Sequence, residues 1–221
     1  MSEPRRQAGA SVLRDLRRRI VLNELQPGTV LTELGLAETL GCSQAAVREA
    51  LLRLEGEGLV ARAGRQGTTV TALDRDAAEE ILALRRRIET RAAARIVPRA
   101  GSGDLASLEA ELTSMRGAAR DGDLWAMVEA DIAFHLALFR IAALPAMEPI
   151  LARCILHTHR FRLWAPWHRR KLAATAARHA PILAALEARD AVALAEAMGH
   201  HLDTIVEPPT SKTKKTEETP G

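Results

Sequence analysis

The chain has 221 residues, of which 47% are hydrophobic and 27% are charged, a composition typical of one large or two small globular domains. Its 31 Lys and Arg nearly balance 28 Asp and Glu, so binding to nucleic acid would require basic groups concentrated locally. No apolar run approaches the roughly 18 residues of a membrane span, and the first ten residues lack the apolar segment of a signal peptide. These features predict a cytoplasmic protein, with Cys42 and Cys154 as reduced thiols.

Three helices are predicted in the first 57 residues. Apolar periodicity marks an amphipathic helix over residues 12–25, which ends before a Pro-Gly pair, and a second helix over residues 32–40. Gly41 can close the second helix in a left-handed conformation. Ser43 is a suitable N-cap for a third helix that runs to about residue 57.

One β-like stretch follows, over residues 59–72. Two short runs, LVARA and TTVTA, flank the turn Gly64-Arg65-Gln66-Gly67, which is typical of a hairpin. Two short helices joined by a tight turn and followed by a hairpin describe a winged helix-turn-helix, here expected over residues 8–73.

Such a module would bind DNA with the N-terminal end of its third helix and with the tip of the wing. The residues expected to contact DNA are Ser43, Gln44, Ala45, Arg48, Arg65, Gln66 and Gly67. Gln44 and Arg48 can reach base edges or phosphates. From periodicity alone, a small helical domain with a hairpin and no DNA-binding role remains an equally good interpretation.

The rest of the chain is predicted to be helical, with an all-helical domain over residues 75–206, to which the family resemblance described below assigns ligand binding and dimerisation, and a disordered tail over residues 207–221. The expected helices span residues 75–98, 103–119, 122–142, 146–164, 168–188 and 190–206. The overall fold class is therefore mainly α, an α+β winged helix followed by an antiparallel helical bundle.

Four polar residues interrupt the apolar stripes of these helices. Asp131 and His135 stand four apart on one face of the third, and His179 lies on the stripe of the fifth. In the last helix the spacing places His201 on the apolar stripe and its neighbour His200 outside it. A lone buried carboxylate is costly, so Asp131 needs a partner.

Three imidazoles and one carboxylate are suitable ligands for Zn²⁺, Ni²⁺, Mn²⁺ or Fe²⁺. Satisfied core histidines, or a purely structural polar core, are alternatives, and so is a metal-dependent enzyme that activates water. No spare Glu, Asp or His is recognisable beside the four as a general base, so no catalytic residue is assigned. His157 and His159 lie near two arginines and are interpreted as solvated, with the effector pocket as the alternative place for either.

Residues 34–70 resemble the winged helix of GntR-family bacterial regulators. The matching motifs are LA-x-x-LG-x-S, VREAL-x-x-LE-x-EGLV and G-x-x-V. The resemblance implies DNA binding. The family often has Ser-Arg-Thr-Pro where this chain has Ser43-Gln44-Ala45-Ala46, and Leu34 replaces a common Arg, so the operator bases are not predicted.

The helical part resembles the FCD effector domain of the FadR branch of that family, through AD-x-x-FH-x-x-L, H-x-x-I and M-x-x-HL. In metal-binding members these motifs supply one Asp and three His, which fall on Asp131, His135, His179 and His201. The R-x-x-[LI]-E opening of the domain falls on residues 85–89, and its Arg, here Arg85, would face the carboxylate of an effector. Pro181, two residues after His179, can start or kink a helix and displace that ligand.

The resemblance therefore implies a homodimeric regulator, not an enzyme, that acts as a repressor on an operator with two-fold related half-sites. A divalent metal and Arg85 would bind a small organic acid and so change operator affinity. A direct metal sensor, in which the ion itself is the signal, is the alternative.

Overall fold

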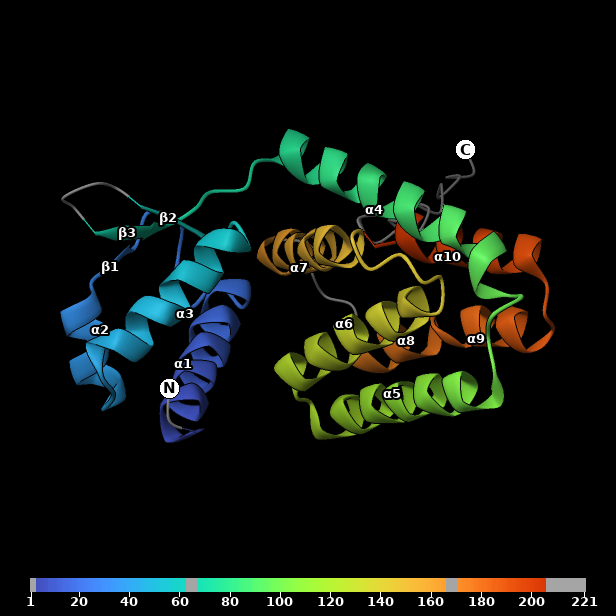
Figure 1. Cartoon of the computed structure of the whole chain (residues 1–221). Coiled ribbons are helices and arrows are strands. Elements are labelled where there is room, and N and C mark those ends of the chain that lie inside the picture. The colour runs from blue at the N-terminus through green and yellow to red at the C-terminus, as the bar shows by residue number, and fades with distance from the viewer. Residues whose placement is uncertain (1–2, 63–66, 166–170, 206–221) are drawn as a thin grey trace, which may run out of the picture.

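The computed structural model describes residues 3–62, 67–165 and 171–205 of the chain. Figure 1 shows a small N-terminal unit beside a larger, all-helical body. The N-terminal elements are α1 (Glu3–Val21), β1 (Val30–Leu31), α2 (Glu33–Leu40), α3 (Gln44–Gly56), β2 (Val60–Arg62) and β3 (Thr68–Val70). The helices that follow are α4 (Arg75–Ile96), α5 (Ser102–Asp121), α6 (Leu124–Arg140), α7 (Glu148–Trp164), α8 (Leu172–Ala177), α9 (Ala180–Glu187) and α10 (Ala191–Asp203). The mainly α fold with a small β-sheet is as predicted.

Ser43 and Gly41 act at the helix ends as expected, and Thr32, predicted as the first residue of its helix, is the N-cap of α2. The side chains of Thr32 and Ser43 cap the N-terminal ends of the two helices by accepting backbone hydrogen bonds. Gly41 ends α2 with a φ of 61°, a left-handed conformation that glycine adopts without steric cost. The first helix ends earlier than predicted, at Val21, and Asn23 then turns the chain with a φ of 63°.

The wing is a three-stranded antiparallel sheet with strand order β1-β3-β2. The predicted hairpin is present as β2 and β3, with Val60 opposite Val70. The expectation of a single β-like stretch is wrong, because β1 pairs Val30 with Thr69. Two residues are too few to produce a period-two pattern, so only the tertiary pairing defines this strand.

The predicted helix over residues 168–188 is also wrong. The structure has two short helices there, α8 and α9, which are separated at Arg178 and His179. Pro181 lies in the first turn of α9, where its missing N–H leaves no hydrogen bond unmade. His179 therefore occupies the N-cap position of α9 instead of a place within a continuous helix.

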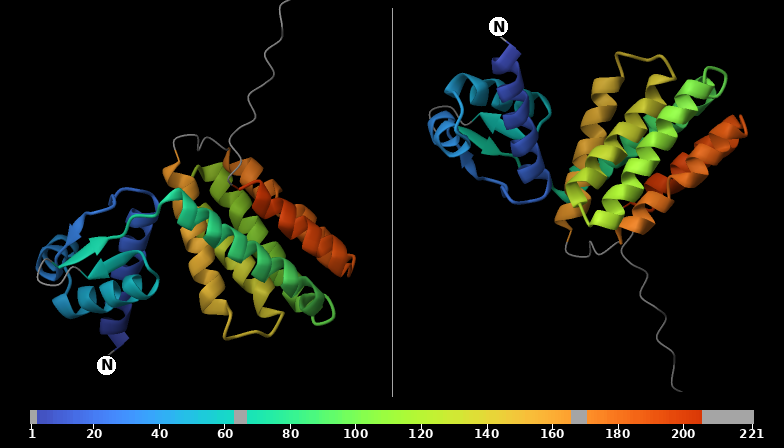
Figure 2. Two further views of the ribbon diagram at one scale, coloured as in Figure 1. Left: turned by 90° about the horizontal axis from the view of Figure 1, so that it is seen from above. Right: turned by 90° about the horizontal axis from the view of Figure 1, so that it is seen from below.

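The hydrophobic core has two parts, one in the bundle and one in the winged helix. The second part also includes Trp125 and Val128 of α6 and Leu156 of α7. The two views of Figure 2 show the N-terminal unit along one side of the bundle. An ion pair of 2.5 Å between Arg14 and Glu129 joins α1 to α6 across this junction.

Candidate functional site

Four polar side chains converge inside the bundle. Asp131 and His135 lie one turn apart on α6, His179 precedes α9, and His201 belongs to the last turns of α10. All four are at most 4% exposed, whereas His200 is exposed. One potential ligand atom from each lies within 4.8 Å of those of the other three. The structure thus brings together the four residues that the sequence selected.

The separations between these atoms fit a common metal ligand shell. Asp131 Oδ1 lies 3.2 Å from His179 Nε2, and Asp131 Oδ2 lies 3.8 Å from His135 Nε2. His135 Nε2 and His201 Nε2 are 3.2 Å apart. Ligand bonds of about 2.0–2.2 Å to a central ion place neighbouring ligand atoms at separations of this size.

Two of the histidines are oriented by outer partners. His135 Nδ1 donates to Glu89 Oε2 at 2.6 Å, and His179 Nδ1 donates to the carbonyl of Thr175 at 3.1 Å. In both rings the Nε2 lone pair then faces the centre of the cluster, as metal-bound histidines require. The expectation that no further acid or base stands beside the four is wrong, because Glu89 touches His135. The sequence motif contained Glu89, but only the packing of α4 against α6 and α10 reveals the contact.

The charge state of the cluster suits metal binding. Burial alone would raise the pKa of Glu89, but His135 and Arg85 beside it lower the pKa to about 2. Asp131 is likewise buried, yet the hydrogen bond from His159 Nε2 holds its pKa well below the usual range. Burial lowers the pKa of His201, so its ring is neutral near pH 7 and can act as a ligand.

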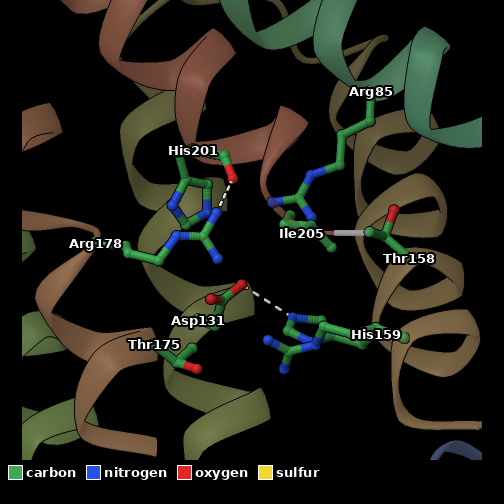
Figure 3. Close-up of a pocket in the computed structure, with 9 residues that line it drawn as sticks. Arg85, Asp131, Thr158, His159, Thr175, Arg178, His201 and Ile205 are labelled. Atoms are coloured by element: carbon green, nitrogen blue, oxygen red, sulfur yellow. Dashed lines mark hydrogen bonds and ion pairs between the residues drawn. The ribbon is translucent and has the colours of Figure 1, made fainter. Parts of the chain in front are cut away.

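A small cavity adjoins the cluster (Figure 3). Its lining residues are Arg85, Asp131, Thr158, His159, Arg162, Thr175, Arg178, His201 and Ile205. Arg85 is 0% exposed, and its Nε donates to Glu89 Oε1 at 2.6 Å. Both of its Nη nitrogens are buried without a hydrogen-bond partner among residues 3–62, 67–165 and 171–205. Three guanidinium groups around one carboxylate make this cavity suited to an anion.

The interpretation of His157 and His159 as solvated is wrong, since both are buried. His159 Nε2 donates to Asp131 Oδ2 at 2.9 Å, which places it at the cavity. His157 Nε2 points the other way and donates to the carbonyl of Glu57 at 2.9 Å. Bundle helices cover one face of α7 and the winged helix covers another, a burial that no local sequence signal reports.

The residues expected to contact DNA are accessible at the start of α3. The exposed ones there are Ser43, Gln44, Ala45 and Arg48. Arg48 is paired with Glu33 of α2 at 2.6 Å, a contact that the sequence did not suggest. At the wing, Gly67 has a φ of 94°, while Arg65 and Gln66 lie outside the described residues. Among the helices that the structure describes, none combines the length and the hydropathy of a membrane-spanning segment.

Two family models match the chain. The model described as "Bacterial regulatory proteins, gntR family" matches residues 9–70, and the FCD domain model matches residues 80–204. The first match covers the winged helix, and the second covers the bundle with the Asp-His cluster.

Known regulators are similar in sequence. The HTH-type transcriptional regulator McbR of Escherichia coli K12 is 32% identical over 133 residues, which is 60% of this chain and 60% of McbR. The HTH-type transcriptional repressor RspR of the same organism is 28% identical over 204 residues, 92% of this chain and 90% of RspR. The alignment to McbR thus spans less than two thirds of that relative.

Solved structures have the same architecture. E. coli McbR/YncC superposes with a TM-score of 0.75 and 25% identity, over 92% of this chain and 95% of that one. A putative GntR regulator from Rhodococcus sp. RHA1 gives a TM-score of 0.70 at 24% identity, over 88% and 93% of the two chains, and supports the fold alone.

Proposed function

The chain belongs to the gntR family of bacterial regulatory proteins and carries an FCD domain, and we propose that this transcriptional regulator responds to a small organic acid held beside a divalent metal ion. Its similarity to transcription regulators over most of its length makes it a regulator and not an enzyme. The interpretation as a metal-dependent enzyme is therefore set aside.

The metal ligands in this proposal are Asp131, His135, His179 and His201. Their burial, their separations and the inward Nε2 atoms of His135 and His179 support it. Zn²⁺, Ni²⁺, Mn²⁺ and Fe²⁺ all accept imidazole and carboxylate ligands. The ion would supply positive charge and open coordination positions to an anion.

The observation that carries the acid-binding proposal is the state of Arg85. Its Nε is held by Glu89, while two buried Nη nitrogens lack a partner within the described residues and line the cavity. A buried donor without an acceptor is costly, and a carboxylate can accept two parallel bonds from such a guanidinium. Glu89 fixes the guanidinium in place before the acid binds, which reduces the ordering cost of binding.

We propose that the regulator acts as a homodimer on an operator with two-fold related half-sites, read by the exposed start of α3. RspR is described as a repressor, and this supports repression as the mode of control. Bound acid would favour one spacing of the two winged helices, which is a shift between pre-existing arrangements.

Thermal unfolding of metal-stripped protein tests the site. Mono-, di- and hydroxycarboxylates are each screened with and without Zn²⁺, Ni²⁺, Mn²⁺ or Fe²⁺. We expect at least one of these acids to stabilise only the metal-loaded protein. A saturating acid at about 100 times its Kd should add about 2.7 kcal/mol to the free energy of unfolding.

The Arg85→Met variant should lose the response to the acid and keep its metal content. Arg75→Met, which alters an exposed arginine of the same helix, is the control. No response to any acid, or an unchanged response in Arg85→Met, contradicts the proposal.

A direct metal sensor is the second candidate, and the small size of the cavity favours it. Operator fragments for the test can be selected from random duplexes. Titration of operator affinity with metal alone, followed by acids at fixed metal, separates the two functions. A full response to metal alone identifies the sensor.

A further inference from the structure

Helix α7 borders both the cavity and the winged helix. Figure 1 shows it on the side of the bundle that faces α3 and β2. On its cavity side lie Thr158, His159 and Arg162. A different side of the same helix presents His157, Arg160 and Trp164 to the N-terminal unit.

On the cavity side, His159 contacts the proposed metal site directly. Its Nε2 donates to Asp131 Oδ2 at 2.9 Å, and the ring is 4% exposed. The other oxygen of that carboxylate lies 3.2 Å from His179 Nε2. A change in the position of Asp131 would therefore stretch or break its hydrogen bond to His159 of α7.

The next residue, Arg160, is bound to the segment between the wing and α4. Its Nη1 donates to Thr71 Oγ1 at 2.9 Å, and its Nη2 donates to the carbonyl of the same residue. The Thr71 hydroxyl in turn donates to the carbonyl of Gly58 at 2.8 Å. The guanidinium carbon lies 4.2 Å from the ring centroid of Trp164, whose Nε1 donates to the carbonyl of Val21.

Together with the hydrogen bond from His157 to the Glu57 carbonyl, these contacts hold the ends of three N-terminal elements. They reach the end of α1, the end of α3 and the residue after β3. All of them originate within two turns of one helix, so these ends follow α7 if it moves.

Burying the charge of Arg160 costs free energy, so this residue is not explained by stabilisation of the junction between α7 and the N-terminal unit alone. It is 0% exposed, and no carboxylate pairs with it in the described ranges of the chain. Burial lowers its pKa to about 10, which still leaves it charged at neutral pH. An apolar residue of similar volume at such a position is often neutral or stabilising. A buried cation whose acceptors are two atoms of one linker residue is better explained by a role in positioning that residue.

We propose that α7 couples the metal and effector site to the DNA-reading unit, with His159 as the contact to the site and Arg160 as the contact to Thr71. This inference rests on the proposed metal and effector site. Residues 159 and 160 are adjacent in one helix and cannot move independently, so a ligand that fixes Asp131 also biases Thr71. Arg160 and Thr71 are positioning residues in this proposal, and neither lines the cavity.

Hydrogen exchange measured by mass spectrometry tests the coupling without a known operator or acid, with Zn²⁺ alone as the probe. In the wild-type full chain, Zn²⁺ added to metal-stripped protein should slow exchange in α9 and α10, at the site. It should also slow exchange roughly fivefold or more, the lower end of typical coupling, in residues 57–62 and 67–74. In Arg160→Met the site should respond to Zn²⁺ as in wild type, and the distant segments should lose their response.

Arg160→Lys, which keeps the charge but replaces the two Nη donors to Thr71 with a single nitrogen, should give an intermediate response. The control is Arg116→Met, which removes an exposed guanidinium of α5 and should behave as wild type. If Arg160→Met does not fold, Thr71→Val removes the hydroxyl acceptor and is judged by the same criteria.

The outcomes separate the two proposals. A wild-type protein whose site does not respond to Zn²⁺ contradicts the metal site itself. A responding site with no distant response in wild type, or with an undiminished distant response in Arg160→Met, overturns the coupling and leaves the metal site intact.

Discussion

The start of α3 and the interior of the bundle use charged residues in opposite ways. Arg48 at the start of α3 is exposed and pairs with Glu33 at the surface. Arg85 in the bundle is 0% exposed, pairs with the equally buried Glu89 and has two nitrogens without a partner among the described residues. The first arrangement costs little and can be exchanged for contacts to a phosphate. The second arrangement costs free energy, because buried donors lack acceptors. This supports a ligand that accepts hydrogen bonds from the two nitrogens of Arg85.

The comparison also separates folding from function. Substitutions at the surface of α3 should change DNA affinity and leave stability unchanged. Substitutions inside the bundle should change both stability and binding, because the same contacts position the site and hold the helices. Four predictions test this contrast.

The largest expected effect is on stability. Glu89→Ala should lower the free energy of unfolding of the metal-free protein by about 3–5 kcal/mol, because it leaves Arg85 as an uncompensated buried charge. Denaturant titration measures this loss. The matched control is Glu79→Ala, which removes an i,i+4 partner of Arg75 on the same helix with side chains 59% and 55% exposed, and should cost no more than about 0.5 kcal/mol. Equal losses in the two variants would contradict the contrast.

The next prediction concerns metal content. His201→Ala should lower metal affinity by more than the roughly 10–100-fold typical of outer-shell changes, since it removes a proposed ligand. His200→Ala, one residue away and exposed, should leave metal content unchanged. Elemental analysis of the two purified variants, followed by metal titration, makes the measurement. Loss of metal in the His200 variant alone would show that His200, and not His201, is the ligand on α10.

Stability should also depend on pH. Burial lowers the pKa of His157, His201 and His159, the last to about 4, below the usual value of 6.5. For His159 the unfolded chain then binds more protons than the folded one between pH 6.5 and about 4, so stability falls as the pH drops through this window, and His157 and His201 add to the loss below pH 6.5. The slope contributed by His159 should approach ~1.4 kcal/mol per pH unit inside this window. Denaturant titrations of metal-free protein at pH 7, 6 and 5 measure it, and a flat profile would contradict the burial of these rings.

The smallest effect is expected at the surface. Arg48→Ala should weaken binding to a selected operator duplex roughly tenfold, with metal content and stability unchanged. Glu33→Gln should strengthen binding a few-fold, because it releases Arg48 from its present partner. Fluorescence anisotropy at fixed salt measures both affinities. A weaker operator complex in Glu33→Gln would mean that the pair positions Arg48 for DNA instead of competing with it.

Part of the candidate site could be predicted from the sequence, because its residues lie at regular spacings within single helices. Asp131 and His135 are four residues apart on an apolar helical stripe, and spacing alone separates His201 from His200. A helix has one period, so a polar residue on its apolar face must lie in the interior. The capping roles of Ser43 and Gly41 follow from equally local chemistry.

Other features depended on packing between distant segments. Glu89 became an outer partner of His135 across 46 residues, and His157 and His159 became buried because two separate parts of the fold cover α7. The strand β1 exists only through its pairing with β3. None of these contacts leaves a periodic or local trace.

By itself, the sequence determined the winged helix-turn-helix, most of the helices of the bundle and which four residues point inward, because these depend on periodicity, capping and residue type within one helix or turn. Only the tertiary structure decided which side chains orient those four, which nitrogens of Arg85 lack a partner within the described residues, and that Arg160 binds Thr71. Those facts depend on distances between segments far apart in the chain, which hydrophobic burial and close packing set for the whole molecule at once.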